Sequence, residues 1–118
     1  SRYIIPDSLK NIYTAKFMMN TFNTTIHARK TITAGIHPKD KTTRCQILSS
    51  KENKDYYDLI LSFGKLTDTY SLLNTSLNLH GYPVVNDLDD ALYVLDNSGL
   101  DGLILTKHMV LKSESVIN

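Results

Sequence analysis

The clearest pattern of hydrophobic and polar positions lies between residues 25 and 49, where the two kinds of residue alternate. Apolar residues share one side of this alternation from Ile26 to Ile36, and a second alternating stretch runs from Thr43 to Ile47. The segment between them contains Pro38 and three charged residues, a composition typical of a turn. A period of two with β-branched residues is typical of a half-buried strand. The pattern therefore predicts an antiparallel β-hairpin over residues 25–49.

Apolar spacings of three and four residues predict helices on both sides of this hairpin. A helix is expected over residues 8–22, with Asp7 or Ser8 as its cap. Between residues 56 and 77 the apolar positions recur at spacings of 3 and 4, which favours one helix over residues 54–78. Gly64 lies inside that segment and costs a helix about 1 kcal/mol relative to Ala. The alternative is a strand over residues 57–61 followed by a shorter helix that begins at Thr67.

The C-terminal part of the chain has sharper boundaries. Asn86 or Asp87 is expected to cap a helix that stops near Gly99. The apolar runs at 103–105 and 109–111 then predict a final strand or strand pair. An N-terminal helix, an antiparallel hairpin, two further helices and C-terminal strands indicate an α+β fold. We expect one domain over residues 1–118, frayed at 1–5 and 113–118.

Composition narrows the class of protein. Of the 118 residues, 42% are hydrophobic and 21% are charged, as in ordinary globular proteins, so disorder is not expected. No apolar run approaches the roughly 20 residues that a membrane helix needs, and no membrane contact is predicted. The single cysteine, Cys45, cannot form an intramolecular disulfide and lies on the apolar side of a predicted strand. These features favour an intracellular, cytoplasmic protein.

Charge is distributed unevenly along the chain. Residues 1–54 contain ten Lys and Arg and three acidic residues, whereas residues 55–118 contain three Lys and nine acidic residues. Such asymmetry is typical of proteins that contact nucleic acid or an acidic surface. The predicted contact residues are the basic residues of the hairpin, Arg29, Lys30, Lys39, Lys41 and Arg44. An ordinary solvated sheet face is the alternative, and the hairpin contains no aromatic residue on which a base could stack.

The resulting interpretation is a small, non-catalytic binding or regulatory protein that contacts nucleic acid or an acidic surface. The alternative is a protein-interaction or assembly module, such as a homodimer, that acts through the apolar helix seam at residues 56–77. Its expected interface residues are Leu66, Tyr70, Leu73 and Leu77.

An enzyme is the third interpretation. None of the common catalytic or nucleotide-binding motifs occurs. A metal-independent ribonuclease could use His27 or His37 as acid or base, with a second group from Arg29, Lys39 or Tyr82, but no spacing selects among them. The acidic residues Asp87, Asp89 and Asp90 could ligate a divalent cation, although helix capping explains them better. No catalytic residue, metal ligand or cofactor is therefore predicted.

Overall fold

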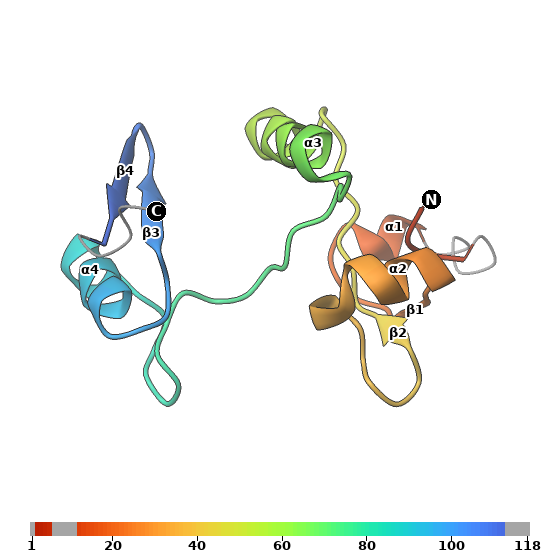
Figure 1. Cartoon of the computed structure of the whole chain (residues 1–118), viewed down its shortest axis with the longest axis horizontal. Helices are drawn as coiled ribbons and strands as arrows, with labels where there is room; N and C mark the ends of the chain where they lie inside the picture. The colour runs from red at the N-terminus through yellow and green to blue at the C-terminus, as the bar shows by residue number, and fades with distance from the viewer. Residues whose placement is uncertain (1, 6–11, 113–118) are drawn as a thin grey trace. The chain divides into compact units, whose positions relative to one another are not determined.

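The computed structural model describes residues 2–5 and 12–112. The chain divides after Leu73 into two compact units (Figure 1). Short helices and two small, separate antiparallel sheets make up these residues, which confirms the predicted α+β class. The prediction of a single domain over the whole chain stays a prediction. Among the described helices, none is both long enough and apolar enough to cross a lipid bilayer.

The first unit is built around a small core near its N-terminus. The short helix α1 (Ile12–Ala15) is followed by strand β1 (Phe22–Asn23), which pairs antiparallel with strand β2 (Thr42–Thr43). The buried residues of this core are Ile4, Ala15 and Phe22, and the half-buried side chains of Cys45 and Ile47 pack against them. Burial also raises the pKa of the Cys45 thiol, as expected for a packing residue.

The helix predicted over residues 8–22 is shorter than the sequence pattern suggests. Its first positions, 8–11, lie outside the described residues, and α1 ends at Ala15. Met18 then adopts a left-handed φ of 54°, which a continuing helix cannot accommodate. Phe22 is buried in β1 instead of lying on a helix face.

The hairpin predicted over residues 25–49 is wrong. Residues Ile26–Thr31 form helix α2, and a 3₁₀ turn, η2 (Thr33–Gly35), follows it. The physical reason is a helix cap: the hydroxyl of Thr25 accepts a hydrogen bond from the backbone N–H of Ala28 at 3.1 Å. The second predicted strand does contribute β2, but β2 pairs with β1 and not with residues 26–36.

Helix α3 (Lys54–Thr67) begins at the residue where the prediction of one helix over 54–78 placed its start, but it ends at Thr67. The side chain of Asn53 caps it by accepting from the backbone N–H of Tyr56 at 3.0 Å. Asp68 then adopts a left-handed φ of 57°, and its carboxylate receives two hydrogen bonds from the Arg2 guanidinium at 2.9 and 3.1 Å. The extension to residue 78 and the alternative strand over 57–61 are both wrong.

The presence of Gly64 inside α3 is explained by the Tyr70 side chain, which packs against the helix at this residue. A Cβ atom added to Gly64 would lie 2.2 Å from Cδ1 of the Tyr70 ring, so the ring packs directly on the helix backbone. Tyr70 is held there because its backbone N–H donates to the Tyr3 hydroxyl at 2.7 Å. Gly64 therefore weakens the helix locally and permits the close contact that ends it.

The predicted apolar seam is not continuous. Leu66 and Leu73 are 87% and 65% exposed, which contradicts burial of this seam within the chain. Tyr70 covers Gly64, and Leu77 packs against the core of the second unit. A role of these four residues in self-association stays a prediction.

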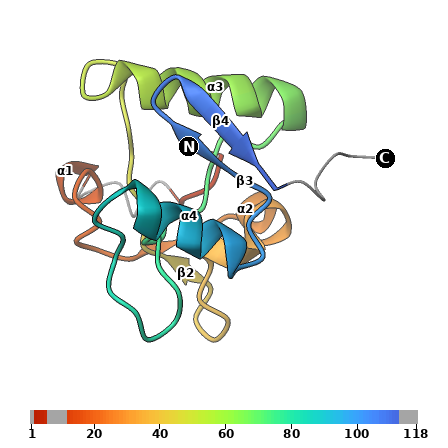
Figure 2. The same ribbon diagram turned by 90° about the vertical axis from the view of Figure 1, so that its left-hand side faces the viewer.

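The second unit follows the sequence prediction closely. Helix α4 (Leu88–Asp96) lies beside a hairpin of strands β3 (Gly102–Leu105) and β4 (His108–Leu111), as Figures 1 and 2 show. The strands pair antiparallel, with Leu103 opposite Val110. The buried residues between helix and hairpin are Ala91, Leu95 and Leu103. The predicted helix and strand pair are thus confirmed.

Candidate active site

The loop between η2 and β2, residues 36–42, is closed by its own backbone. The N–H of His37 donates to the carbonyl of Thr42 at 2.8 Å, and the N–H of Lys41 donates to the carbonyl of His37 at 3.1 Å. Lys41 takes a left-handed φ of 60°, which lets the chain reverse. The loop also binds the adjacent turn, because the Thr43 hydroxyl donates to the carbonyl of Gly35 at 2.7 Å. These bonds hold the backbone of the loop in one conformation.

A histidine and a carboxylate lie next to each other in this loop. Nδ1 of His37 is 3.3 Å from Oδ1 of Asp40, and both side chains are exposed. The same Oδ1 accepts hydrogen bonds from the backbone N–H of Thr42 at 2.9 Å and from its hydroxyl at 2.8 Å. These bonds, with a smaller contribution from His37, lower the pKa of Asp40. The carboxylate is therefore ionised and oriented toward the imidazole.

A buried threonine ties helix α2 to the same loop. Thr24 is 1% exposed, and its hydroxyl donates to the carbonyl of Lys41. The guanidinium of Arg29 donates to that hydroxyl through Nε at 3.2 Å and to the carbonyl of Thr24 at 3.3 Å. Arg29 and Lys41, which the sequence places in different segments, are thereby connected through one buried side chain.

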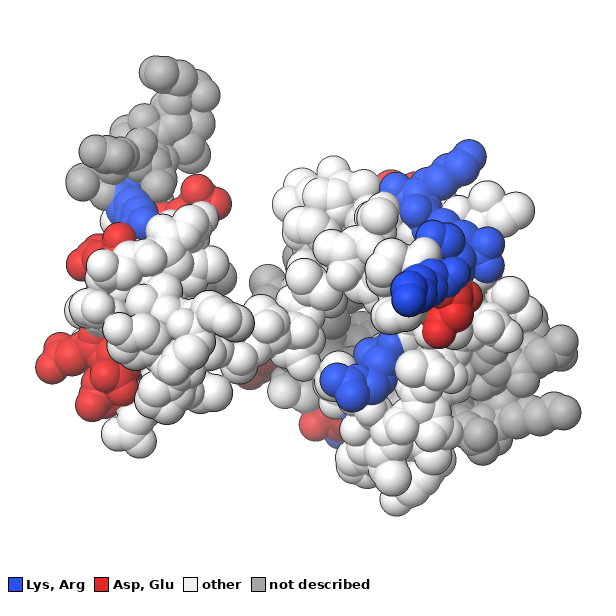
Figure 3. All heavy atoms as spheres, turned by 90° about the horizontal axis from the view of Figure 1, so that it is seen from below, with Lys and Arg blue, Asp and Glu red and all other residues white. Residues whose placement is uncertain are grey.

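The basic residues predicted as contact residues surround this loop. Arg29 and Lys30 lie on α2, Lys39 and Lys41 lie in the loop, and Arg44 directly follows β2. We call these five residues the basic surface. All five are exposed, and Figure 3 shows Lys and Arg side chains gathered on one face of the first unit.

The basic surface has an excess of positive charge, since its five cations surround a loop whose acidic residue is Asp40. Elsewhere in the first unit, Arg2 pairs with Asp68, Lys16 with Glu52 and Lys54 with Asp58, whereas Lys51 and Lys65 form no ion pair within the described residues. Within residues 2–5 and 12–112, no member of the basic surface forms an ion pair. The amino group of Lys41 donates to the carbonyl of Pro38, which leaves its charge unneutralised. The site can therefore attract an anion.

His27 and Tyr82, which were also proposed for acid–base chemistry, lie outside the loop at 36–42. His27 lies on α2 with its ring 5.6 Å from the Tyr3 ring, and its Nε2 is buried without a hydrogen-bond partner. Tyr82 belongs to the second unit. Among the described histidines, His37 alone is paired with a carboxylate. The sequence signal for this pair is the spacing of three residues between His37 and Asp40 across Pro38, which sequence reasoning did not use.

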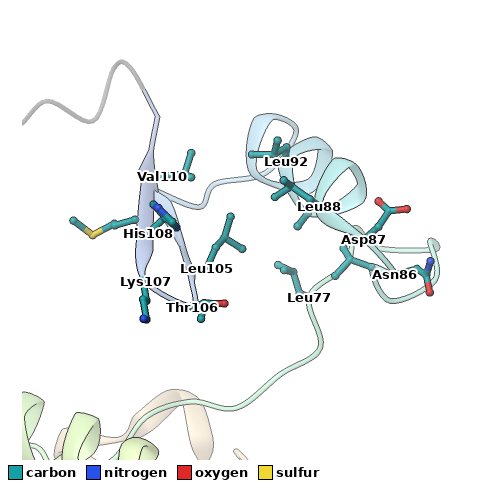
Figure 4. Close-up of a pocket in the computed structure, with 13 residues that line it drawn as sticks. Leu77, Asn86, Asp87, Leu88, Leu92, Leu105, Thr106, Lys107, His108 and Val110 are labelled. Atoms are coloured by element: carbon teal, nitrogen blue, oxygen red, sulfur yellow. The ribbon is translucent and has the colours of Figure 1, made fainter.

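The second unit contains a groove of a different character. It has a volume of about 970 Å³ and lies between α4 and the β3–β4 hairpin. Figure 4 shows Leu77, Leu88 and Leu105 turned toward this space, whereas Asn86 lies at its outer side. The groove is thus mainly apolar and lacks a set of converging polar groups.

The acidic residues beside that groove serve the helix. Asp87 accepts from the backbone N–H of Asp90 at 3.0 Å, and Asp90 accepts from the backbone N–H of Asn86 at 3.0 Å. This reciprocal capping confirms the structural interpretation of the acidic segment. In the described part of the chain, no three His, Cys, Asp or Glu side chains are grouped closely enough to hold a metal ion.

Comparison with known proteins gives a family match over nearly the whole chain. The family profile described as "Carbamoyltransferase C-terminus" matches residues 3–112. The nodulation protein NolO of Bradyrhizobium diazoefficiens is 32% identical over 108 residues, which cover 92% of this chain and 19% of that protein. An uncharacterized protein of Methanocaldococcus jannaschii is 35% identical over 108 residues, which cover 92% of this chain and 21% of that protein. The nodulation protein NolNO of Sinorhizobium fredii is 31% identical over 85 residues, which cover 72% of this chain and 12% of that protein.

These matches correct the functional interpretation. They point to an enzyme domain related to carbamoyltransferases and contradict a non-catalytic, nucleic-acid-binding regulatory protein. The chain spans about a fifth of the length of the first two relatives. The physical reason for the error is that clustered Lys and Arg attract any phosphate group, so charge alone does not identify a nucleic acid as the ligand.

Proposed function

We propose that this chain, which belongs to the carbamoyltransferase C-terminus family, takes part in carbamoyl-group transfer and binds the anionic carbamoyl donor at its basic surface. The observation that carries the proposal is a set of five exposed cations around the loop at 36–42, none of which forms an ion pair within the described residues. The family match supports this class of reaction, and the excess positive charge supports this place for the anion.

The chemistry of the transfer explains why cations are needed. An activated carbamoyl donor such as carbamoyl phosphate carries its charge on phosphate oxygens. When an acceptor attacks the carbamoyl carbon, the bond from that carbon to the bridging oxygen breaks, and phosphate leaves with the electron pair. Charge-assisted hydrogen bonds from Arg and Lys stabilise both the bound donor and the leaving phosphate.

Two cations have especially suitable positions. Arg29 is oriented by its hydrogen bonds to Thr24, so its remaining guanidinium N–H groups are held in a defined direction. Arg44 is the residue that follows β2, and its planar guanidinium group can donate to two phosphate oxygens at once. We assign the lysines of the loop a more general electrostatic role, because an ammonium group is a point charge on a flexible stem.

Titration calorimetry of the protein with carbamoyl phosphate tests this proposal. We expect saturable binding that weakens as the salt concentration rises. Inorganic phosphate should compete with carbamoyl phosphate for the same site. Methyl carbamate is the matched control, because it carries the carbamoyl group without the phosphate charge, and it should bind far more weakly. Equal binding of the two compounds, or no binding of carbamoyl phosphate, would contradict the assignment.

We also propose a cytoplasmic location. The support is Cys45, a free thiol that packs against the core of the first unit, as is common in proteins of reducing compartments.

A further inference from the structure

We propose that Thr24 is a positioning residue for the carbamoyl donor: its hydroxyl orients Arg29 so that one free edge of the guanidinium group can bind the phosphate of the donor. Thr24 does not itself contact the ligand. This inference rests on the proposed function and deepens it, because it assigns the phosphate to Arg29 together with the loop at 36–42.

The guanidinium group of Arg29 uses only one of its edges within the protein. Its Nε donates to the Thr24 hydroxyl at 3.2 Å, and its Nη2 donates to the carbonyl of the same residue at 3.3 Å. The second edge consists of one N–H of Nη1 and one N–H of Nη2, and it has no hydrogen-bond partner among residues 2–5 and 12–112. Two parallel N–H groups of this kind bind two oxygens of one phosphate. The free edge of Arg29 can therefore receive the donor.

The hydroxyl of Thr24 also connects Arg29 with the loop. Thr24 is buried, and its hydroxyl donates to the carbonyl of Lys41 while it accepts from Arg29. Lys41 is the residue whose left-handed φ of 60° reverses the chain. One hydroxyl therefore fixes both the guanidinium group on α2 and the backbone of the loop that carries Lys39 and Lys41.

Thr24 is itself anchored to the core of the first unit. It forms an antiparallel bridge with Ile4, which is buried in that core. The backbone N–H of the next residue, Thr25, donates to the carbonyl of Tyr3 at 3.0 Å, and the Thr25 side chain caps the helix that carries Arg29. The hydroxyl oxygen of Thr24 thus has a defined position, as a positioning group requires.

Orientation contributes to affinity in a way that charge does not. An arginine side chain that is already fixed loses less conformational freedom when it binds an anion. Removal of the Thr24 hydroxyl leaves the charge of Arg29 in place but frees its guanidinium group. Affinity should then fall while its dependence on salt concentration stays the same, because salt screens charges and the charges are unchanged.

Two substitutions separate the hydroxyl of Thr24 from its shape. Thr24→Val keeps the shape and removes the hydroxyl, whereas Thr24→Ser keeps the hydroxyl and removes a buried methyl group. In titration calorimetry, Thr24→Val should weaken the binding of carbamoyl phosphate and of inorganic phosphate about tenfold at every salt concentration. Thr24→Ser should bind both within about twofold of the unsubstituted protein, although the lost methyl group lowers its midpoint of urea denaturation.

Thr43→Val is the matched control for loss of a hydroxyl near the loop. Thr43 is also buried, and its hydroxyl donates to the carbonyl of Gly35, but it does not bond Arg29. This variant should lower the midpoint of urea denaturation as Thr24→Val does, because both leave a carbonyl without its donor. It should weaken phosphate binding no more than about twofold.

A double-mutant cycle with Arg29→Lys shows whether Thr24 acts through the arginine. Lysine keeps the charge but lacks the planar donor group, so Thr24→Val should cause no further loss of affinity in this background. The proposal is overturned if Thr24→Val binds as tightly as the unsubstituted protein, if Thr24→Ser or Thr43→Val loses as much affinity as Thr24→Val, or if the loss persists in Arg29→Lys. Absence of carbamoyl phosphate binding by the unsubstituted protein would instead refute the proposed function, and this role with it.

Discussion

Replacement of Leu95 by Ala is expected to lower the free energy of unfolding by about 2–5 kcal/mol. Leu95 is 2% exposed and lies in the centre of the core that joins α4 to the β3–β4 hairpin, against Ala91 and Leu103. The substitution removes buried apolar atoms and leaves a cavity that the short hairpin cannot fill by moving, because four residue pairs fix its register. This core is small, so the loss is a large part of its stability.

The control for this prediction is Leu88→Ala in the same helix. Leu88 is 54% exposed, so the same atoms are removed without a buried cavity. Urea denaturation followed by circular dichroism should show a change below about 1 kcal/mol for this variant. Similar midpoints for both variants would mean that Leu95 is not buried as described.

Reversal of two charges on the basic surface is expected to weaken carbamoyl phosphate binding about a hundredfold or more. The double variant Lys39→Glu with Arg44→Glu removes two cations that form no ion pair with any described residue, and it introduces two anions at the same positions. Each hydrogen bond to a charged group contributes about 1.5–3 kcal/mol, and repulsion by the new carboxylates adds to the loss. Calorimetry measures the change directly.

A matched pair of lysines distinguishes local contacts from net charge. Lys51→Glu with Lys65→Glu makes the same charge change in the first unit, at exposed positions before α3 and on it. This control should reduce binding only slightly, and more at low salt than at high salt. If both double variants lose the same affinity, donor binding depends on overall charge and not on the basic surface.

The second unit shows where sequence reasoning succeeds. The cap at Asp87, the apolar face of α4 and the paired apolar runs are all local signals within about 25 residues. Each element makes its decisive contacts with its neighbour along the chain. Local pattern and tertiary packing therefore agree in this part of the molecule.

Residues 25–49 show where prediction from the sequence fails. The alternation of apolar and polar residues from Ile26 to Ile36 suggested a strand, but residues Ile26–Thr31 form a helix that the Thr25 side chain caps. β2 takes its partner from β1, about 20 residues earlier, and each strand is only two residues long. Such a short, non-local pairing leaves almost no signal in the sequence.

The role of the basic surface as a binding site stays a prediction. The residues of the basic surface were identified because unpaired charges cluster in the sequence, and the structure places them around one loop. The ligand class could not follow from charge alone, because any phosphate satisfies the same donors. The pairing of His37 with Asp40 depends on the turn geometry that Thr42 and Lys41 create, and spacing alone does not reveal that geometry.

The central claim is that the protein takes part in carbamoyl transfer. It is tested most directly by following isotopically labelled carbamoyl phosphate in the presence of the protein and methanol. Phosphorus and carbon NMR of one sample would follow inorganic phosphate and methyl carbamate together. The account predicts protein-dependent formation of both compounds in equal amounts, suppressed by the Lys39→Glu and Arg44→Glu changes. Release of phosphate no faster than without protein, or no carbamoylated product, would contradict it.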